Sequence, residues 1–257
     1  MKVRSEPASG GMAQKLIRTE SDIRDGVRVL RRRCSVMKAI HERSGDPPLR
    51  RYQADFAGLA RIIVGQQLSI ASASAIWARL ERSLSTVSAE RIARARPTAL
   101  AAAGLSAAKI RTLKALADAT RGVNPALRID RLGGASDEDV RRALTAVHGV
   151  GPWTADIFVM FCLGRADAWA AGDLALQVGV ARAFALGERV SADETLRIAE
   201  RWRPWRGVAA RLVWADYANL RRQQPADPAN AGKETAAALR ADGARRRATR
   251  SSQPRSE

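Results

Sequence analysis

The feature that most constrains the fold is a short connection between two helical patterns, centred on Gly149-Val150-Gly151. Residues 136–147 place apolar side chains at helical spacing behind Ser136, which begins a capping-box pattern. Residues 153–163 predict a second helix, and Pro152 occupies a first-turn position that needs no N–H donor. Glycines on either side of one apolar residue allow a tight turn with positive φ. The sequence therefore predicts two helices joined by a glycine hairpin.

This hairpin has features of a turn that binds the phosphate backbone of DNA. Val150 is expected to plug the turn into the core, while the N–H groups of Gly149 and Gly151 point outward. Backbone N–H groups beside a helix N-terminus are suited to a phosphate oxygen. A plain helix-loop-helix would explain the tripeptide equally well.

The charge balance narrows the class of partner. The chain of 257 residues carries 44 Lys and Arg against 26 Asp and Glu, a formal net charge of +18. Such an excess favours a polyanionic partner, of which nucleic acid is the simplest, over a merely basic soluble protein. The longest apolar run is far too short to cross a membrane. We expect a monomer in the cytoplasm, associated with the nucleoid and not with a membrane.

The two cysteines, Cys34 and Cys162, lie far apart in the sequence. Their number and spacing exclude a zinc ribbon and a four-cysteine iron–sulfur cluster. They also fit a reducing compartment.

The pattern along the chain predicts an all-α protein, because no stretch alternates apolar and polar residues as a β-strand does. Residues 1–20 are polar and predict a disordered leader, and residues 21–222 predict the folded domain. Residues 223–257 have few large apolar side chains and include Arg245-Arg246-Arg247. They predict a disordered basic tail that adds nonspecific affinity for DNA.

Five stretches between about Phe56 and Tyr217 form an ordered series. In chain order they are Ile62–Ser69, Gly104–Ile110, the hairpin, Ala171–Gln177 and Trp202–Arg206. Over this span the chain resembles the helix-hairpin-helix (HhH-GPD) DNA glycosylases, and in particular the DNA-3-methyladenine glycosylase II branch. The resemblance implies two helical lobes around a DNA-binding cleft, with the hairpin at their junction. It also implies double-stranded DNA containing a damaged base as the partner, and base excision repair as the process.

Asp173 is the candidate catalytic residue. Breaking a base–sugar bond builds positive charge on the sugar, which a nearby carboxylate stabilises. Locally, Asp173 starts a helical pattern and could serve only as an N-cap, but the resemblance implies that it is the catalytic aspartate. The alternatives are Asp156, which interrupts an apolar helix and predicts a buried polar contact, and Asp167, which is expected in a connecting segment.

Two tryptophans, Trp153 and Trp214, match positions that line the base pocket in this family. A cationic alkylated base would stack well on an indole ring, although both residues could equally be part of the core. At two further positions where related enzymes carry aromatic residues, this chain has Ile157 and Leu174. The resemblance therefore implies a less aromatic pocket.

The resemblance also bears on strand cleavage. Members of the family that cut the DNA strand form a Schiff base through a lysine. Trp153 stands at that position here, which implies a monofunctional enzyme that uses water and has no AP-lyase activity. Lys109 is the other lysine near a motif, and we expect it to be a surface charge on a helix.

Further DNA contacts are implied in the turn Gln66-Gln67-Leu68. The family places there the wedge that fills the gap left by a flipped base, and Gln67 matches this position, with Leu68 as the alternative. Hairpins of this family also hold a monovalent cation through backbone carbonyls. Here a sodium or potassium ion would lie at the carbonyls of Thr145, Val147 and Val150, and no other cofactor is implied.

Two other functions stay open. A glycosylase for uracil, hypoxanthine or another lesion would use the same chemistry with a different pocket. A non-catalytic DNA-binding module would use the same hairpin, but it would need neither Asp173 nor a domain of this length.

Overall fold

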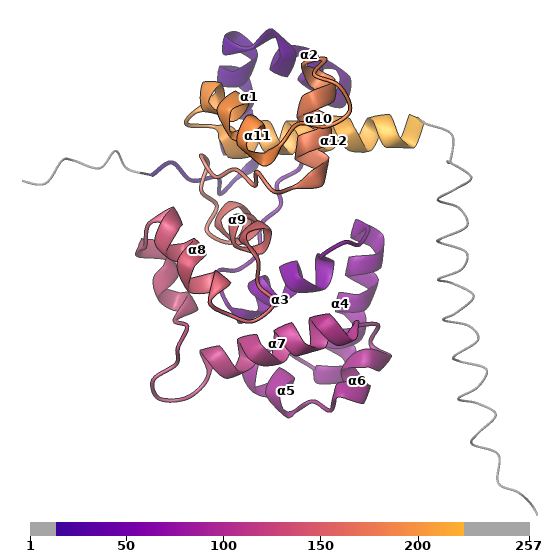
Figure 1. Cartoon of the computed structure of the whole chain (residues 1–257), viewed down its shortest axis with the longest axis vertical. Coiled ribbons are helices and arrows are strands. Elements are labelled where there is room, and N and C mark those ends of the chain that lie inside the picture. Colours follow the sequence, from indigo (N-terminus) through magenta and orange to yellow (C-terminus); the bar gives the residue numbers. More distant parts are fainter. Residues whose placement is uncertain (1–13, 224–257) are drawn as a thin grey trace, which may run out of the picture. The chain divides into compact units, whose positions relative to one another are not determined.

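The computed structural model describes residues 14–223 (Figure 1). The chain divides into two units, Met1–Asp216 and Tyr217–Glu257, and the whole candidate site lies in the first. Residues 14–223 contain helices and no strand, apart from an isolated bridge between Leu16 and Arg165. This confirms the predicted all-α class for the part of the chain that the structure describes. Within the same residues, none of the helices combines the length and apolar character needed to cross a membrane.

Most helices begin where a Ser, Thr or Asp side chain accepts a hydrogen bond from the first turn. Local sequence therefore decides where they start. The helices are α1 (Glu20–Arg33), α2 (Ser35–Ser44), α3 (Phe56–Gly65), α4 (Ile70–Leu84), α5 (Ala89–Arg94), α6 (Pro97–Ala102), α7 (Ala107–Thr120), η1 (Ile129–Gly134), α8 (Asp137–Thr145), α9 (Pro152–Phe161), α10 (Leu174–Ala183), α11 (Ala192–Ala199), η2 (Glu200–Trp202) and α12 (Arg206–Gln223).

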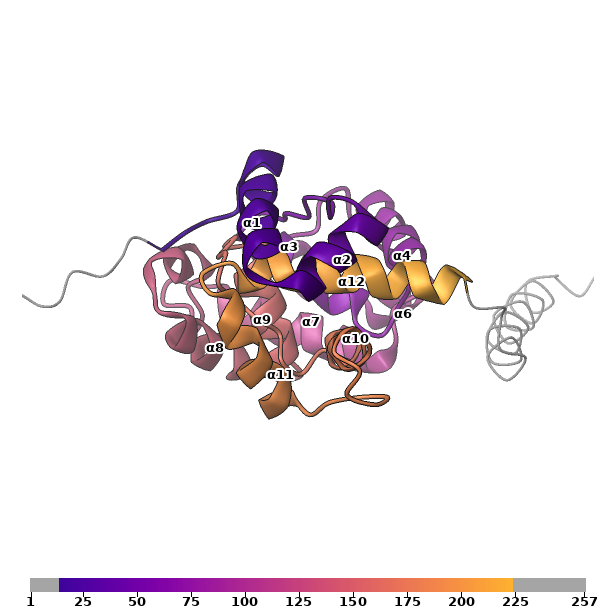
Figure 2. The ribbon, with the colours of Figure 1, turned by 90° about the horizontal axis from the view of Figure 1, so that it is seen from above.

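Within the first unit the helices form two groups. In one, α7 packs against α3, α5 and α6, and α4 packs on α3. In the other, α1 packs on α2 and α10 on α11, as the view from above also shows (Figure 2). Helix α9 lies between the groups and contacts both α3 and α8 (Figure 1). The predicted two lobes with the α8–α9 hairpin at their junction are therefore confirmed.

Helix α9 is the most deeply buried element that positions the site. All its residues from Thr154 to Phe161 are buried. Arg211 of α12 is buried as well and donates to the carbonyls of Met160 and Gly207. Burial lowers the pKa of Arg211 to about 10, and its guanidinium lies over the ring of Phe161. This packing fixes α9, and with it the hairpin, against α12.

The prediction of a disordered leader over residues 1–20 is wrong for the last of these residues. Ile17 is fully buried, and its N–H donates to the carbonyl of Gly164 at 2.6 Å. Thr19 caps α1, which begins at Glu20. The backbone of this stretch pairs with the segment after α9, which composition alone cannot show. The rest of the predicted leader (1–13), and the predicted tail from residue 224 on, lie outside the described residues; residue 223 is the last of α12.

Candidate active site and DNA interface

The carboxylate of Asp173 is held by three N–H donors. Asp173 is the N-cap of α10, and its Oδ1 accepts from the backbone N–H of Leu176 at 2.9 Å. Trp214 donates its indole N–H to the same oxygen at 2.9 Å, and Trp153 donates to Oδ2 at 2.7 Å. Hydrogen bonds to a charged acceptor are stronger than neutral ones, so this arrangement stabilises and orients a half-buried negative charge.

The three donors are divided unequally between the two oxygens. A carboxylate oxygen has two lone pairs that can accept hydrogen bonds. Both positions of Oδ1 are filled, by Trp214 and Leu176, whereas among residues 14–223 Oδ2 receives only the indole of Trp153. Oδ2 therefore keeps one position for a water molecule or for a developing positive charge.

The local N-cap interpretation of Asp173 is confirmed, and it is compatible with the catalytic one. The two alternative aspartates are both committed to arginines. Asp156 is only 7% exposed and pairs with Arg141, and burial raises the pKa of Asp156. The predicted buried polar contact of Asp156 is thus confirmed.

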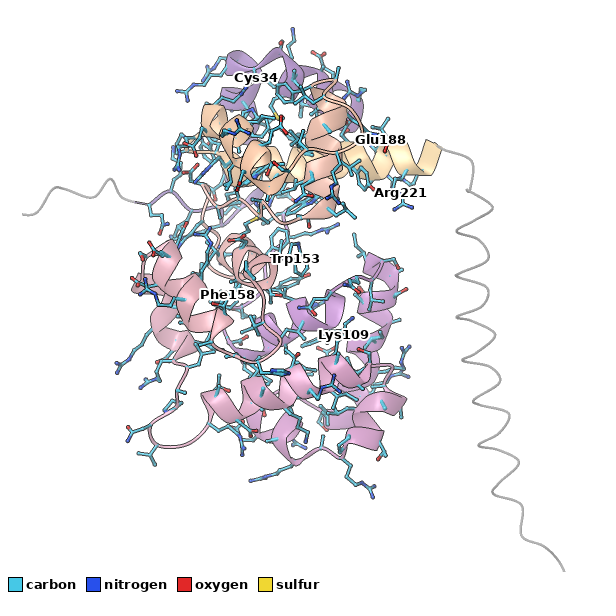
Figure 3. All side chains as sticks on the ribbon, in the orientation of Figure 1. Cys34, Lys109, Trp153, Phe158, Glu188 and Arg221 are labelled. Carbon is cyan, nitrogen blue, oxygen red and sulfur yellow. The ribbon has the colours of Figure 1, made fainter. Side chains whose placement is uncertain are left out.

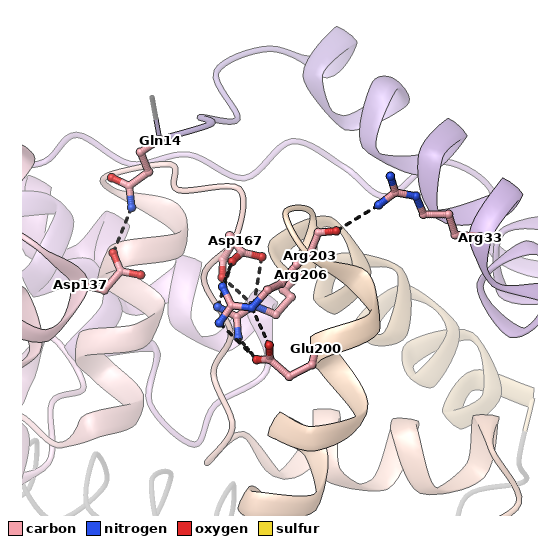
Figure 4. A network of polar contacts seen from close by, with 7 residues as sticks. All are labelled: Gln14, Arg33, Asp137, Asp167, Glu200, Arg203 and Arg206. Atoms are coloured by element: carbon pink, nitrogen blue, oxygen red, sulfur yellow. Dashed lines mark hydrogen bonds and ion pairs between the residues drawn. The ribbon is translucent and has the colours of Figure 1, made fainter. Parts of the chain in front are cut away.

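Asp167 lies between α9 and α10, as expected, in a cluster of ion pairs with Arg203 and Arg206 (Figure 4). Glu200 pairs with the same two arginines. Asp167 therefore belongs to a structural network that joins the segment before α12 to the connection after α9.

The predicted pocket residues differ in their exposure. Trp153 and Trp214 are half-buried, and Figure 3 shows Trp153 on α9. Leu174 is 57% exposed beside Asp173, whereas Ile157, one helical turn after Trp153, is 5% exposed. Trp153, Trp214 and Leu174 can therefore meet a ligand, while Ile157 offers almost no surface to one. The sequence did not indicate that both indoles would bond to Asp173.

Of the two hairpin glycines, Gly149 and Gly151, the structure requires glycine only at the first. Gly149 has φ +81°, and a Cβ there would lie 2.0 Å from Oγ1 of Thr112 on α7. Gly151 has φ −95°, and no atom lies within 4 Å of the place of its Cβ. The expected turn with positive φ is thus confirmed, at Gly149, whereas Gly151 is extended and is the N-cap of α9. Val150 is 5% exposed, so its predicted role as a buried plug is confirmed.

The proposed cation ligands lie in the same turn. The carbonyl of Val147 accepts a hydrogen bond from the N–H of Val150 at 3.0 Å, which leaves its second lone pair. The cation site at Thr145, Val147 and Val150 stays a prediction. Among residues 14–223, no group of His, Cys, Asp and Glu side chains is arranged to hold a metal ion, and both cysteines are free thiols.

The turn Gln66-Gln67-Leu68 follows α3 directly. Gln67 is exposed and has φ 55°, a conformation that costs energy for a residue other than glycine. Leu68 is 39% exposed, so either side chain can serve as the wedge. The amide of Gln66 instead points inward and donates to Oγ1 of Thr154 at 2.8 Å.

Lys109 is not the surface charge that we expected. Its side chain, labelled in Figure 3, is half-buried and reaches from α7 to the end of α3, and burial lowers its pKa. Its Nζ donates to the carbonyls of Val64 and Gln66, both at 2.8 Å. Periodicity marks the helix of Lys109 but gives no sign of these partners, which lie more than forty residues away in the sequence.

Comparisons with known proteins show which family the chain belongs to. The model of the HhH-GPD superfamily of base excision DNA repair proteins matches residues 60–204, more than half of the chain. DNA-3-methyladenine glycosylase 1 of Schizosaccharomyces pombe is 32% identical over 170 residues, which are 62% of this chain and 73% of that protein. A Bacillus subtilis relative is 32% identical over 88 residues, and the match spans 34% of this chain and only 31% of that protein.

A solved structure is similar over a larger share of this chain than either sequence match. The S. pombe 3-methyladenine DNA glycosylase in complex with abasic DNA has a TM-score of 0.66 and 26% sequence identity. The similarity covers 74% of this chain and 95% of that one. The chain therefore belongs to the HhH-GPD superfamily of base excision DNA repair proteins.

Proposed function

We propose that this protein is a monofunctional DNA glycosylase that flips alkylated bases of the 3-methyladenine type out of duplex DNA and hydrolyses their N-glycosidic bond. The observation that carries the proposal is the carboxylate of Asp173, which two tryptophan indoles hold beside a helix N-terminus with one acceptor position left on Oδ2. Its S. pombe relative is named a DNA-3-methyladenine glycosylase, and the similar solved structure is a complex with abasic DNA.

The chemistry follows from this carboxylate. When the bond between the sugar C1′ and the base nitrogen breaks, the electron pair leaves with the base and positive charge develops on the sugar. Asp173 stabilises that charge, and its free Oδ2 position accepts a hydrogen bond from the attacking water. The water oxygen then bonds to C1′ and its proton is released, which leaves an abasic site in an intact strand.

The substrate class follows from the two tryptophans that hold Asp173. Trp153 and Trp214 have half-buried indole rings next to Asp173, and the electron-rich face of an indole attracts a cation. An alkylated purine is cationic and therefore also a good leaving group, so its departure does not require a general acid. The proposed enzyme needs no cofactor for this reaction.

The absence of lyase activity rests on the lysines near the site. Trp153 stands where strand-cutting members carry lysine, and the Nζ of Lys109 is engaged by two backbone carbonyls. We further propose that the protein acts as a monomer on damaged chromosomal DNA in the cytoplasm.

The test is to incubate the purified protein with duplex DNA that contains alkylated bases, uracil or hypoxanthine, and to identify the released bases by chromatography. We expect 3-methyladenine and 7-methylguanine, an uncut strand, and no covalent adduct after borohydride treatment. Release of uracil or hypoxanthine alone would overturn the substrate class, and a trapped adduct would overturn the monofunctional mechanism. Binding without release of any base would indicate a DNA-binding module.

A further inference from the structure

The wedge turn Gln66-Gln67-Leu68 has little backbone support of its own. The N–H of Gln66 donates to Ile63 and that of Leu68 to Gly65, both at a long 3.3 Å. Gln67 adopts the left-handed conformation with φ 55° and is exposed. A strained, exposed turn keeps one conformation only where its surroundings impose it.

Two side-chain contacts provide that support. Lys109 on α7 donates from its Nζ to the carbonyls of Val64 and Gln66, where α3 ends and its carbonyls lack partners within the helix. A positive charge at this place also offsets the negative end of the helix dipole. From the other side, the side chain of Gln66 donates to Oγ1 of Thr154 on α9. All three hydrogen bonds measure 2.8 Å.

The same contacts connect the turn to the catalytic carboxylate. Thr154 is 1% exposed and follows Trp153, whose indole N–H holds Oδ2 of Asp173. Helix α7 also reaches the hairpin, because Thr112, one turn after Lys109, lies directly against Gly149. The turn, the hairpin and the carboxylate therefore share one support built on α7 and α9.

We propose that Lys109 is a positioning residue for base flipping. It holds the turn so that Gln67 or Leu68 enters the gap in the duplex at a set place relative to Asp173. This inference rests on the proposed glycosylase function. Its consequence is specific: Lys109 matters most when a paired, stacked base must be opened, and least when the base has no partner to leave.

The test replaces Lys109 with methionine, which keeps the length of the side chain and removes its charge and donors. Single-turnover excision of 7-methylguanine is measured in two duplexes, one with cytosine opposite the lesion and one with an abasic-site analogue opposite it. For the Lys109→Met variant we expect the excision rate to fall about tenfold when cytosine lies opposite the lesion. It should fall by less than about threefold when the abasic-site analogue lies opposite. A residue that merely stabilised the fold would affect both duplexes alike.

The chain provides a matched control on the same helix. Lys114 donates in the same way to the carbonyls of Ala93 and Ala95, at 2.8 and 2.5 Å, where α5 ends. Lys114→Met removes the same kind of contact at the end of α5 instead of at the wedge turn. We expect it to excise from both duplexes at the parent's rate, with a comparable loss of thermal stability. If Lys114→Met slowed excision opposite cytosine as much as Lys109→Met does, the proposal would be overturned.

Thr154→Val is the second variant, because it removes the other support of the turn with almost no change of shape. It should show the same preference for the unpaired lesion, and it serves as the test if Lys109→Met does not fold. Equal losses on the two duplexes in the folded variant overturn the proposal.

A readout that needs no excision separates this inference from the proposed function. With 2-aminopurine as the target base, paired with thymine in a duplex, fluorescence rises when binding flips this base out of the stack. We expect the parent to give this rise and Lys109→Met to give at most about half of it at saturating protein. An equal rise would overturn the positioning role, whether or not the parent excises alkylated bases. A parent that gives the rise but releases no base would contradict the proposed function alone.

Discussion

Replacing Asp173 with asparagine changes one atom of the candidate site and tests the proposed chemistry directly. The carboxylate accepts two N–H groups at Oδ1 and one at Oδ2. An amide has a single oxygen, so its NH2 group must face at least one of these donors. The oxygen should take the Oδ1 place, where it keeps the bonds to Trp214 and Leu176. The indole N–H of Trp153 then loses its acceptor.

The structure sets the size of two separate effects. One orphaned donor on a half-buried indole should lower the free energy of unfolding by about 1 to 2 kcal/mol, which leaves the variant folded. Removing the negative charge beside the sugar should raise the barrier to excision by roughly 4 kcal/mol or more, about a thousandfold in rate. Binding to undamaged duplex DNA should stay close to that of the parent.

The assay is single-turnover release of 7-methylguanine, with thermal unfolding measured on the same preparations. The double variant Asp173→Asn, Trp153→Phe removes the orphaned donor as well. Trp153→Phe should therefore cost less stability in the Asp173→Asn protein than in the parent, without any return of excision. A folded Asp173→Asn protein that excises within about tenfold of the parent would refute the catalytic role of this carboxylate.

Three further predictions concern the two hairpin glycines and Trp214. Gly149→Ala should lower the free energy of unfolding by about 1 to 3 kcal/mol, because Gly149 has positive φ and its Cβ would meet Thr112. Gly151→Ala should unfold at the parent's temperature but bind lesion-free duplexes more weakly, to a similar degree for every sequence in fluorescence anisotropy; unchanged binding would place the phosphate contact elsewhere. Trp214→Leu should raise the activation free energy for excision of 7-methylguanine by about 1 kcal/mol more than Trp214→Phe does. Both variants lose the indole N–H, but only leucine lacks an aromatic face. Equal losses in the two Trp214 variants would show that its N–H, and not stacking, is what matters.

Local sequence determined most of the secondary structure and the place of the hairpin. Ser136 and Asp173 cap the helices that their positions predicted, because an N-cap acts on N–H groups only two or three residues away. Val150 is buried as its place between two glycines indicated. The all-α class followed from the same local periodicity.

Tertiary structure decided what these residues touch. Trp153 and Trp214 lie 20 and 41 residues from Asp173, yet both bond to its carboxylate. Lys109 finds its carbonyls 43 and 45 residues back along the chain, and Ile17 is buried against a segment that follows α9. Sequence patterns record the period of one helix, which says which residues are buried but not which distant groups meet them. Those pairings depend on how whole helices pack, and only the folded chain brings the donors and acceptors of this site together.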